Sequence, residues 1–214
     1  MADNESKKFW DDKHLEGDEL SKMSQHSVFA EQSLTYFPYR AKVIDLGCGT
    51  GADSLFFLHH GCEVLATDYS QPALKELEAR AKGNLNLAVK QLDLSETFPF
   101  ADQAADVIYS HLSLHYFDGA TTQQIFDEIH RVLKPNGVVA VLLNSFTDEE
   151  YGHGEQIEDG YFNIPDKGPK RYFSTATLKP FIKRFETIVL DYKGSDPRRN
   201  HKEDLVRFIG KKAA

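Results

Sequence analysis

Three aspartates and a run of alternating glycines are the residues of this sequence best suited to chemistry. Asp45 lies two residues before the glycine-rich loop Gly47–Gly51, Asp68 closes the next apolar run, and Asp93 follows the one after that. Alternating glycines let the backbone approach a ligand closely, and the N–H groups of a following helix point at whatever binds there. A carboxylate at Asp45 repels a pyrophosphate but attracts a cationic group such as an ammonium. The other two carboxylates can accept hydrogen bonds from ribose hydroxyls and from an exocyclic amine.

The same residues also have simpler interpretations. Glycines suit any tight turn between a strand and a helix, Asp68 could cap the helix near Pro72, and Asp93 could be a turn residue. The spacing Gly47-x-Gly49-x-x-Ala52 fits the dinucleotide fingerprint in its Gly/Ala variant, which leaves a nicotinamide-dependent oxidoreductase open. Asp45 and Asp93 count against that class. A cofactor-binding module without catalysis is a further alternative.

Short apolar runs alternate with amphipathic stretches from residue 42 onward. The expected strands and helices are, in chain order, strand 43–46, helix 52–60, strand 63–67, helix 72–82, strand 85–90, strand 105–109, helix 121–133 and strand 138–143. Near-continuous apolar strands separated by helices predict a parallel sheet covered by helices on both faces. Ligands bind beyond the carboxyl ends of such strands, which is where the aspartates and glycines lie.

The two ends of the chain differ from this repeating core, and the whole chain is interpreted as one domain. Residues 1–40 predict an N-terminal helical lid, with a helical pattern over 19–37, and residues 41–143 form the predicted cofactor-binding core. Residues 144–173 predict a long irregular loop on the acceptor side. Residues 174–214 predict a late helix followed by a terminal antiparallel strand pair.

Charge is distributed unevenly along the 214 residues, whose formal net charge is −8. Residues 1–160 hold 27 acidic and 12 basic side chains, whereas residues 161–214 hold 6 and 13. The negative net charge argues against broad binding to nucleic acid, because such binding needs a basic face. The basic end is expected either to favour an anionic acceptor or to do no more than solvate the surface.

Composition also excludes several classes of protein. The longest apolar run, 138–143, is far shorter than the ~18 residues that a membrane-spanning helix needs. The polar N-terminus lacks the apolar core of a secretion signal, and Cys48 and Cys62 are expected to be free thiols in a reducing cytoplasm. Neither cysteine has a metal-ligand neighbour, so no metal site is predicted.

The segment 45–51 resembles the cofactor motif of the class I S-adenosylmethionine-dependent methyltransferases. Similar segments follow in family order over about residues 40–145, at 67–70, 92–94, 105–108 and 131–137. The two ends are loosely similar to small bacterial enzymes of the tellurite-resistance and thiopurine type. The resemblance implies a Rossmann-like, seven-stranded, mostly parallel sheet whose last strand is antiparallel. It also implies S-adenosylmethionine as cofactor and S-adenosylhomocysteine as product. The cofactor-binding residues that it implies are Asp45, Gly47, Cys48, Gly49, Gly51, Asp68, Tyr69, Asp93, Leu94 and Ser110.

Methyl transfer is an in-line displacement at an activated carbon, so positioning matters most and a general base is optional. His111 and His115, which follow the fourth strand, are the candidate bases; the alternative is that they pack against the end of the sheet. The i, i+4 spacing of these histidines is compatible with a metal, but no accompanying metal motif is present.

A small molecule is the predicted acceptor, because two nucleic-acid signatures are missing. No Asn/Asp-Pro-Pro-aromatic motif follows the fourth strand, and no cysteine nucleophile follows Cys62. RNA or protein remains the alternative acceptor, and the oligomeric state is not readable. Arg171 suits an acidic acceptor. The aromatic loop could equally cover a sheet edge, and Trp10 could anchor the first helix. The predicted substrate contacts are Trp10, Tyr116, Tyr151, Arg171 and Tyr172.

Overall fold

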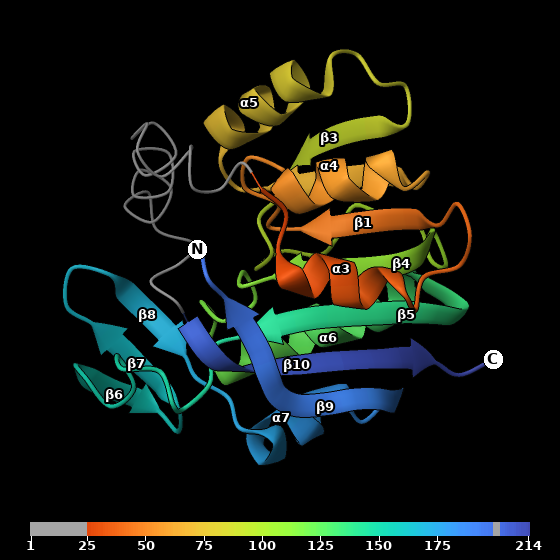
Figure 1. Cartoon of the computed structure of the whole chain (residues 1–214). Helices are drawn as coiled ribbons and strands as arrows, with labels where there is room; N and C mark the ends of the chain where they lie inside the picture. The colour runs from red at the N-terminus through yellow and green to blue at the C-terminus, as the bar shows by residue number, and fades with distance from the viewer. Residues whose placement is uncertain (1–24, 199–201) are drawn as a thin grey trace.

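A seven-stranded sheet forms the centre of the protein, as Figure 1 shows for a computed structural model that describes residues 25–198 and 202–214. Its strand order is β3-β2-β1-β4-β5-β10-β9. The first five strands are parallel to one another: β1 (Lys42–Leu46), β2 (Glu63–Asp68), β3 (Leu87–Gln91), β4 (Ala105–His111) and β5 (Leu133–Leu143). Strand β10 (Lys202–Lys212) is antiparallel to β5 and to β9 (Phe185–Asp196). The predicted fold class, including the antiparallel last strand, is therefore confirmed.

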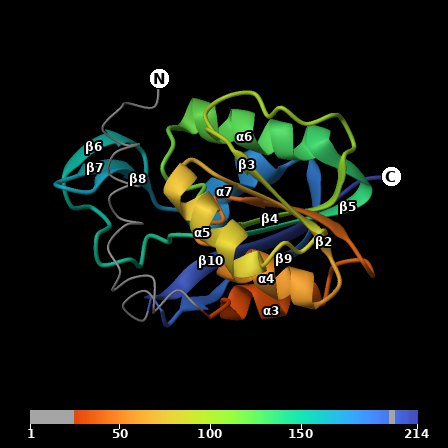
Figure 2. The same cartoon turned by 90° about the horizontal axis from the view of Figure 1, so that it is seen from above.

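Helices cover both faces of this sheet, and Figure 2 shows α6 on one side and α3 and α4 on the other. One face packs against α3 (Val28–Leu34), α4 (Ala52–His59) and α5 (Gln71–Ala81). The other face packs against α6 (Gly119–Val132) and α7 (Thr175–Ile182). No helix among the described residues is long and apolar enough to cross a bilayer.

The apolar strands supply both faces because successive side chains of a strand point in opposite directions. On β1, Val43 packs into the cluster under α4, whereas Ile44 belongs to the cluster under α6. On β5, Val138 and Ala140 face α4, and Val139 faces α6. Continuous apolar runs in the sequence thus correspond to strands that are buried on both faces.

The helices begin where polar side chains satisfy their first N–H groups. Ser70 Oγ accepts from Ala73 N at 3.4 Å at the start of α5, so Ser70 rather than Asp68 caps this helix. Asp118 Oδ1 accepts from Thr121 N at 2.7 Å, so α6 begins two residues before the predicted start. The observed bounds of α4, α5 and α6 lie within two residues of the predicted ones, whereas the helical pattern predicted over 19–37 forms α3 only from Val28 to Leu34 within the described residues.

The segment expected to be an irregular loop contains regular structure, so that expectation was wrong. Residues 155–171 form a three-stranded antiparallel sheet made of β6 (Glu155–Glu158), β7 (Tyr161–Ile164) and β8 (Gly168–Arg171). Each strand is only four residues long, and the first and last are mostly polar, so the sequence shows no strand periodicity there. Most of the predicted N-terminal lid lies outside the described residues.

Many basic side chains of the C-terminal quarter pair with acids from the first 160 residues. Lys167 and Lys170 both contact Glu150, and Arg171 contacts Glu158. The other such pairs, with their N–O distances, are Arg184–Asp127 at 3.2 Å, Lys202–Asp148 at 2.6 Å and Arg198–Asp53 at 3.8 Å. These basic side chains therefore pair with acidic side chains of the first 160 residues within the fold.

Truncation of a core residue on α6 tests this packing. Phe126 is 1% exposed and belongs to the cluster between α6 and the sheet. We expect Phe126→Ala to lower the free energy of unfolding by about 3–5 kcal/mol, because it leaves a cavity. Gln124→Ala, at an exposed position of the same helix, should change it by less than about 0.5 kcal/mol. Urea denaturation measures both, and equal losses would contradict the described core.

Candidate functional site

The glycine-rich loop joins β1 to α4 through a backbone that favours glycine. Gly47, Gly49 and Gly51 have φ values of +74°, +55° and +77°. A Cβ atom on Gly51 would lie 2.3 Å from Leu77 Cδ1, and one on Gly47 would lie 2.3 Å from Ser113 Cβ. Both the left-handed conformation and the close neighbours therefore require glycine at the two outer positions.

Strand β2 fixes this loop in place by accepting its N–H groups. The Thr67 carbonyl accepts from Gly47 N at 2.8 Å and from Cys48 N at 2.9 Å. Asp68 Oδ2 accepts from Gly49 N at 2.8 Å, and Asp68 Oδ1 accepts from Ser70 N at 2.8 Å. The Asp68 carboxylate thus connects the loop to Ser70, the residue that caps α5, and the predicted ligand role of Asp68 stays a prediction.

Asp45 lies beneath the loop and is almost completely buried, at 2% exposure. The pKa of its carboxyl group is raised to about 8, mainly by burial and also by the negative charges of Asp53 and Asp68, while a hydrogen bond from Ser54 acts in the opposite direction. Ser54 Oγ donates to Asp45 Oδ2 at 2.6 Å. Because a nearby cation favours the ionised form of a buried carboxyl, this position suits a positively charged ligand group.

Asp93 and Leu94 lie just beyond β3. Asp93 Oδ1 accepts from Ser95 N at 2.9 Å and from Ser95 Oγ at 2.6 Å, which is the turn that the simpler interpretation predicts. Leu92 N donates to Asp68 O at 3.0 Å, so this segment lies beside the end of β2. The predicted adenine contacts of Asp93 and Leu94 stay predictions.

Two serines connect the end of β4 to the end of β1. Ser110 Oγ donates to Leu46 O at 3.0 Å, Ser113 Oγ donates to the same oxygen at 2.6 Å, and the two hydroxyl oxygens lie 2.5 Å apart. Between them Leu112 adopts a φ of +53°, which is costly for a leucine and which tertiary contacts must hold. Ser110 therefore borders the loop, as expected, whereas the role of Ser113 was missed.

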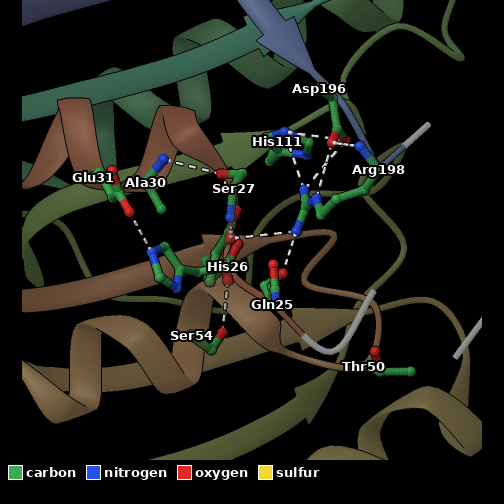
Figure 3. A network of polar contacts seen from close by, with 12 residues as sticks. Gln25, His26, Ser27, Ala30, Glu31, Thr50, Ser54, His111, Asp196 and Arg198 are labelled. Carbon is green, nitrogen blue, oxygen red and sulfur yellow. Dashed lines mark hydrogen bonds and ion pairs between the residues drawn. The ribbon is translucent and has the colours of Figure 1, made fainter. Parts of the chain in front are cut away.

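His111 and His115 occupy different environments. His111 Nε2 lies 3.7 Å from Asp196 Oδ2, with the two side chains 8% and 0% exposed (Figure 3). The buried ring of His115 packs on the Tyr116 ring, with 4.3 Å between the ring centroids. The backbone carbonyl of His115 accepts from Arg171 N at 2.7 Å. The sequence placed both histidines after β4, but only His111 joins the polar network of Figure 3.

That network includes residues that sequence reasoning missed. Arg198 Nε donates to Asp196 Oδ1 at 2.9 Å, and Arg198 Nη1 donates to Gln25 O at 2.7 Å. Asp53 accepts from Ser27 N at 2.6 Å and from Tyr109 Oη at 2.7 Å. These residues come from the segment before α3, from α4, from β4, and from the end of β9 and the turn after it, so no local pattern in the sequence could have grouped them.

The predicted substrate contacts surround the small sheet. Arg171 lies over the Tyr161 ring, 4.9 Å from its centroid, and its guanidinium binds Glu158 and donates to Phe117 O at 3.0 Å. Tyr172 Oη donates to Glu150 Oε2 at 3.2 Å, and Tyr151 is 40% exposed beside its ring. Their roles toward an acceptor stay predictions, as does that of Tyr116, and Trp10 lies outside the described residues.

The remaining predicted cofactor residues line the same edge of the sheet. Tyr69 follows β2, and its carbonyl accepts from Gln91 Nε2 at 2.8 Å. Cys48 is partly buried in the glycine loop, and burial raises the pKa of its thiol well above the ordinary value, so the thiol stays protonated. The described residues contain no group of three or more His, Cys, Asp or Glu arranged to hold a metal ion.

Comparison with known proteins places this arrangement in a family. The family described as "Methyltransferase domain" matches residues 43–137. An uncharacterized methyltransferase from Synechocystis is 36% identical over 101 residues, which cover 47% of this chain and 46% of that protein. A malonyl-[acyl-carrier protein] O-methyltransferase from Enterobacter lignolyticus is 32% identical over 122 residues, which cover 57% of this chain and 45% of that protein. The matches thus span about half the length of these relatives.

A solved structure shares the same fold. A SAM-dependent methyltransferase from Methanosarcina mazei superposes with a TM-score of 0.71 at 21% identity, over 84% of this chain and 96% of that one. The sheet order, the glycine loop at the end of β1 and the matched domain agree with one another. Residues 43–137 of the chain therefore form a methyltransferase domain, and the whole fold is shared with a solved SAM-dependent methyltransferase.

Proposed function

We propose that this protein transfers a methyl group from S-adenosylmethionine to a small-molecule acceptor. The observation that carries the proposal is the convergence of Asp45, the glycine loop and Asp68 at the carboxyl ends of β1 and β2. Ligands bind at this edge in open α/β sheets. The proposal extends to the whole chain what the family match supports for its core.

The chemistry of these groups fits the proposed cofactor. The buried Asp45 carboxyl suits an ammonium, and the N-terminus of α4 directly after Gly51 suits a carboxylate, so together they match an amino-acid moiety. Asp68 ends β2 beside the glycine loop, and the acceptor oxygens of its carboxylate suit the hydroxyl donors of a ribose. A second acidic group at Asp93 suits an exocyclic amine.

The protein's contribution to the reaction is mainly positional. The bound cofactor supplies a methyl carbon on a positively charged sulfur, which is already activated toward displacement. The loop, held by Thr67 and Asp68, would fix that carbon relative to Ser110 and to the segment after β4, where the acceptor would enter. Holding the two reactants in line lowers the barrier without further chemistry.

The ion pairs of the basic residues on the acceptor side bear on the charge proposed for the acceptor. Arg171, Lys170 and Lys202 on the acceptor side each contact a carboxylate, namely Glu158, Glu150 and Asp148. Binding an anion there would require breaking ion pairs that already exist. We therefore propose a small acceptor without assigning it a negative charge.

Calorimetric titration tests the cofactor. We expect S-adenosylhomocysteine to bind with a micromolar dissociation constant, which corresponds to about −8 kcal/mol, and NADH to give no heat of binding. The Asp45 carboxyl can form a favourable charge pair with an ammonium group but not with the pyrophosphate of NADH. Binding of NADH alone would overturn the proposal in favour of an oxidoreductase.

Asp68→Asn tests the ribose contact. The substitution keeps one side-chain oxygen but removes the charge, so we expect the dissociation constant for S-adenosylhomocysteine to rise about 10- to 100-fold. Glu63→Gln at the other end of the same strand is the matched control and should leave the affinity unchanged. Equal affinities in the two variants would show that the ribose lies elsewhere.

Asp45→Asn tests whether the buried Asp45 carboxyl lowers the stability of the free protein while it strengthens binding of the cofactor. The folded free protein keeps the Asp45 proton up to about pH 8, whereas an ordinary carboxyl releases it near pH 3.8. The contribution of this group to stability is therefore complete below pH 3.8 and is lost as the pH rises through 8. Asparagine does not titrate, so we expect it to stabilise the free protein by roughly 2–4 kcal/mol more at pH 8 than at pH 5.

Denaturation of the two proteins at both pH values measures this difference. The variant should also bind S-adenosylhomocysteine at least about tenfold more weakly, because it lacks the charge that pairs with an ammonium. A gain in stability that is the same at both pH values would contradict the raised pKa of Asp45.

A further inference from the structure

Strands β1 and β4 part from each other at the edge of the sheet where the glycine loop lies. They pair with each other only as far as Asp45 and Tyr109. By contrast, β1 pairs with β2 as far as Leu46, and β4 pairs with β5 as far as His111. In the order β3-β2-β1-β4-β5, the chain winds from β1 to one side and then returns to β4 on the other. Ligands of open α/β sheets bind at such a point, so the groups that join β1 to β4 there bear on binding.

The hydroxyl of Ser113 is one of two that join the segment after β4 to the end of β1. Ser113 Oγ donates to the Leu46 carbonyl at 2.6 Å, and Ser110 Oγ donates to the same oxygen at 3.0 Å. One donor satisfies a buried carbonyl group, and Ser110, at 0% exposure, can supply it alone. The hydroxyl of Ser113 is therefore more than the stability of this carbonyl requires.

Ser113 also limits the space around the first glycine of the loop. A Cβ atom on Gly47 would lie 2.3 Å from Ser113 Cβ and 2.5 Å from Ser113 Oγ, which are the two atoms nearest to it. Gly47 and Ser113 are both partly exposed, whereas Leu46 and Ser110 are buried. Both residues of this contact thus reach the surface, as residues beside a ligand site are expected to do.

The backbone just before Ser113 is strained. Leu112 lies in the turn that returns the chain to the Leu46 carbonyl, and its φ is +53°. The N–H group of Leu112 donates to Leu142 O at 3.0 Å, which fixes the turn to β5. Leucine rarely adopts this left-handed conformation, and residues under such strain concentrate at functional sites. A role of Ser113 in binding would account for the strain.

We propose that Ser113 is a positioning residue for the cofactor, because it holds Gly47 and the end of β1 in the conformation that binds the ligand. The inference rests on the cofactor site proposed above and adds to it a residue outside the loop. The Thr67 carbonyl holds the N–H groups of Gly47 and Cys48 from the β2 side, and the Ser113 hydroxyl holds the Leu46 carbonyl from the β4 side. Without that hydroxyl the loop is less restrained on the β4 side, and binding has to order it.

Ser113→Ala tests the proposal by calorimetric titration with S-adenosylhomocysteine and by thermal unfolding of the same preparations. We expect the dissociation constant to rise about 10-fold, because binding must then order the loop. The midpoint of thermal unfolding should fall by less than about 3 °C, because Ser110 still donates to the Leu46 carbonyl. Ser174→Ala is the matched control. It removes the cap of α7, so it should lower the midpoint by about 2–4 °C and leave the dissociation constant unchanged.

Hydrogen–deuterium exchange of the protein without ligand separates positioning from overall stability. Ser113→Ala should speed exchange at the amides of Gly47 and Cys48 about 10-fold, whereas the amides of β10 should exchange as in the wild type. A serine that serves only stability would leave the loop amides unchanged or speed exchange throughout the sheet. Either of those results would overturn the proposed role of Ser113.

A double-mutant cycle tests whether Ser113 acts through Gly47. Gly47→Ala should weaken binding of S-adenosylhomocysteine, because its Cβ would meet Ser113 and because a φ of +74° disfavours alanine. In the Ser113→Gly background the same substitution should weaken binding about 10-fold less, since the side chain that the Cβ would meet is gone. If Gly47→Ala fails to fold, Ser113→Ala and the exchange rates still decide.

The possible outcomes distinguish this inference from the proposed function. Equal dissociation constants in the wild type and Ser113→Ala would overturn the inference and leave the proposed function standing. A weakening that Ser174→Ala reproduces would also overturn it, because the effect would then reflect stability alone. Failure of S-adenosylhomocysteine to bind the wild-type protein would contradict the proposed function and, with it, the inference.

Discussion

The backbone of the turn after β1 is the constraint on which the rest of the site depends. The chain can leave the centre of the sheet and enter α4 only through three residues with positive φ, and only glycine leaves room there for Leu77 and Ser113. The carbonyl of Thr67 and the carboxylate of Asp68 then hold this strained path through its own N–H groups. The loop, the end of β2 and the starts of two helices consequently behave as one unit.

Acidic side chains near this turn are buried in three different ways, and each has a different consequence. Asp45 has the hydroxyl of Ser54 as its donor, and burial raises its pKa to about 8, so it responds to a cation. Asp53 accepts from Ser27 and Tyr109, which stabilise its charge. Asp196 pairs with Arg198. The same residue type thus serves as a buried acid with a raised pKa, a structural anchor and an ion-pair partner, according to its neighbours.

The sequence alone was sufficient to predict those features of the fold and the site that depend on residues close together in the chain. The glycines, Asp45 and Asp68 lie within one strand–turn–helix unit and the strand after it, so their proximity follows from the chain direction of a parallel sheet. The pairing of Asp196 with His111, by contrast, joins residues 85 positions apart, and no periodicity connects them. The small sheet of β6–β8 was missed because its strands are too short to show alternation. The residue type of Arg171 suggests an anion contact, and only the fold shows that Glu158 already neutralises it.

The position of β10 also determines the order in which the sheet can be completed. It follows β9 in the chain, yet it lies between β9 and β5. The apolar edge of β5, from Val138 to Leu143, therefore has no partner on that side until residues 202–212 have been synthesised and have inserted. An unpaired apolar edge is a template for intermolecular pairing, so this interval is when the nascent chain is most exposed to aggregation. Because Asp196 and Arg198 lie just before β10 in the chain, the polar network around His111 is also completed late in synthesis.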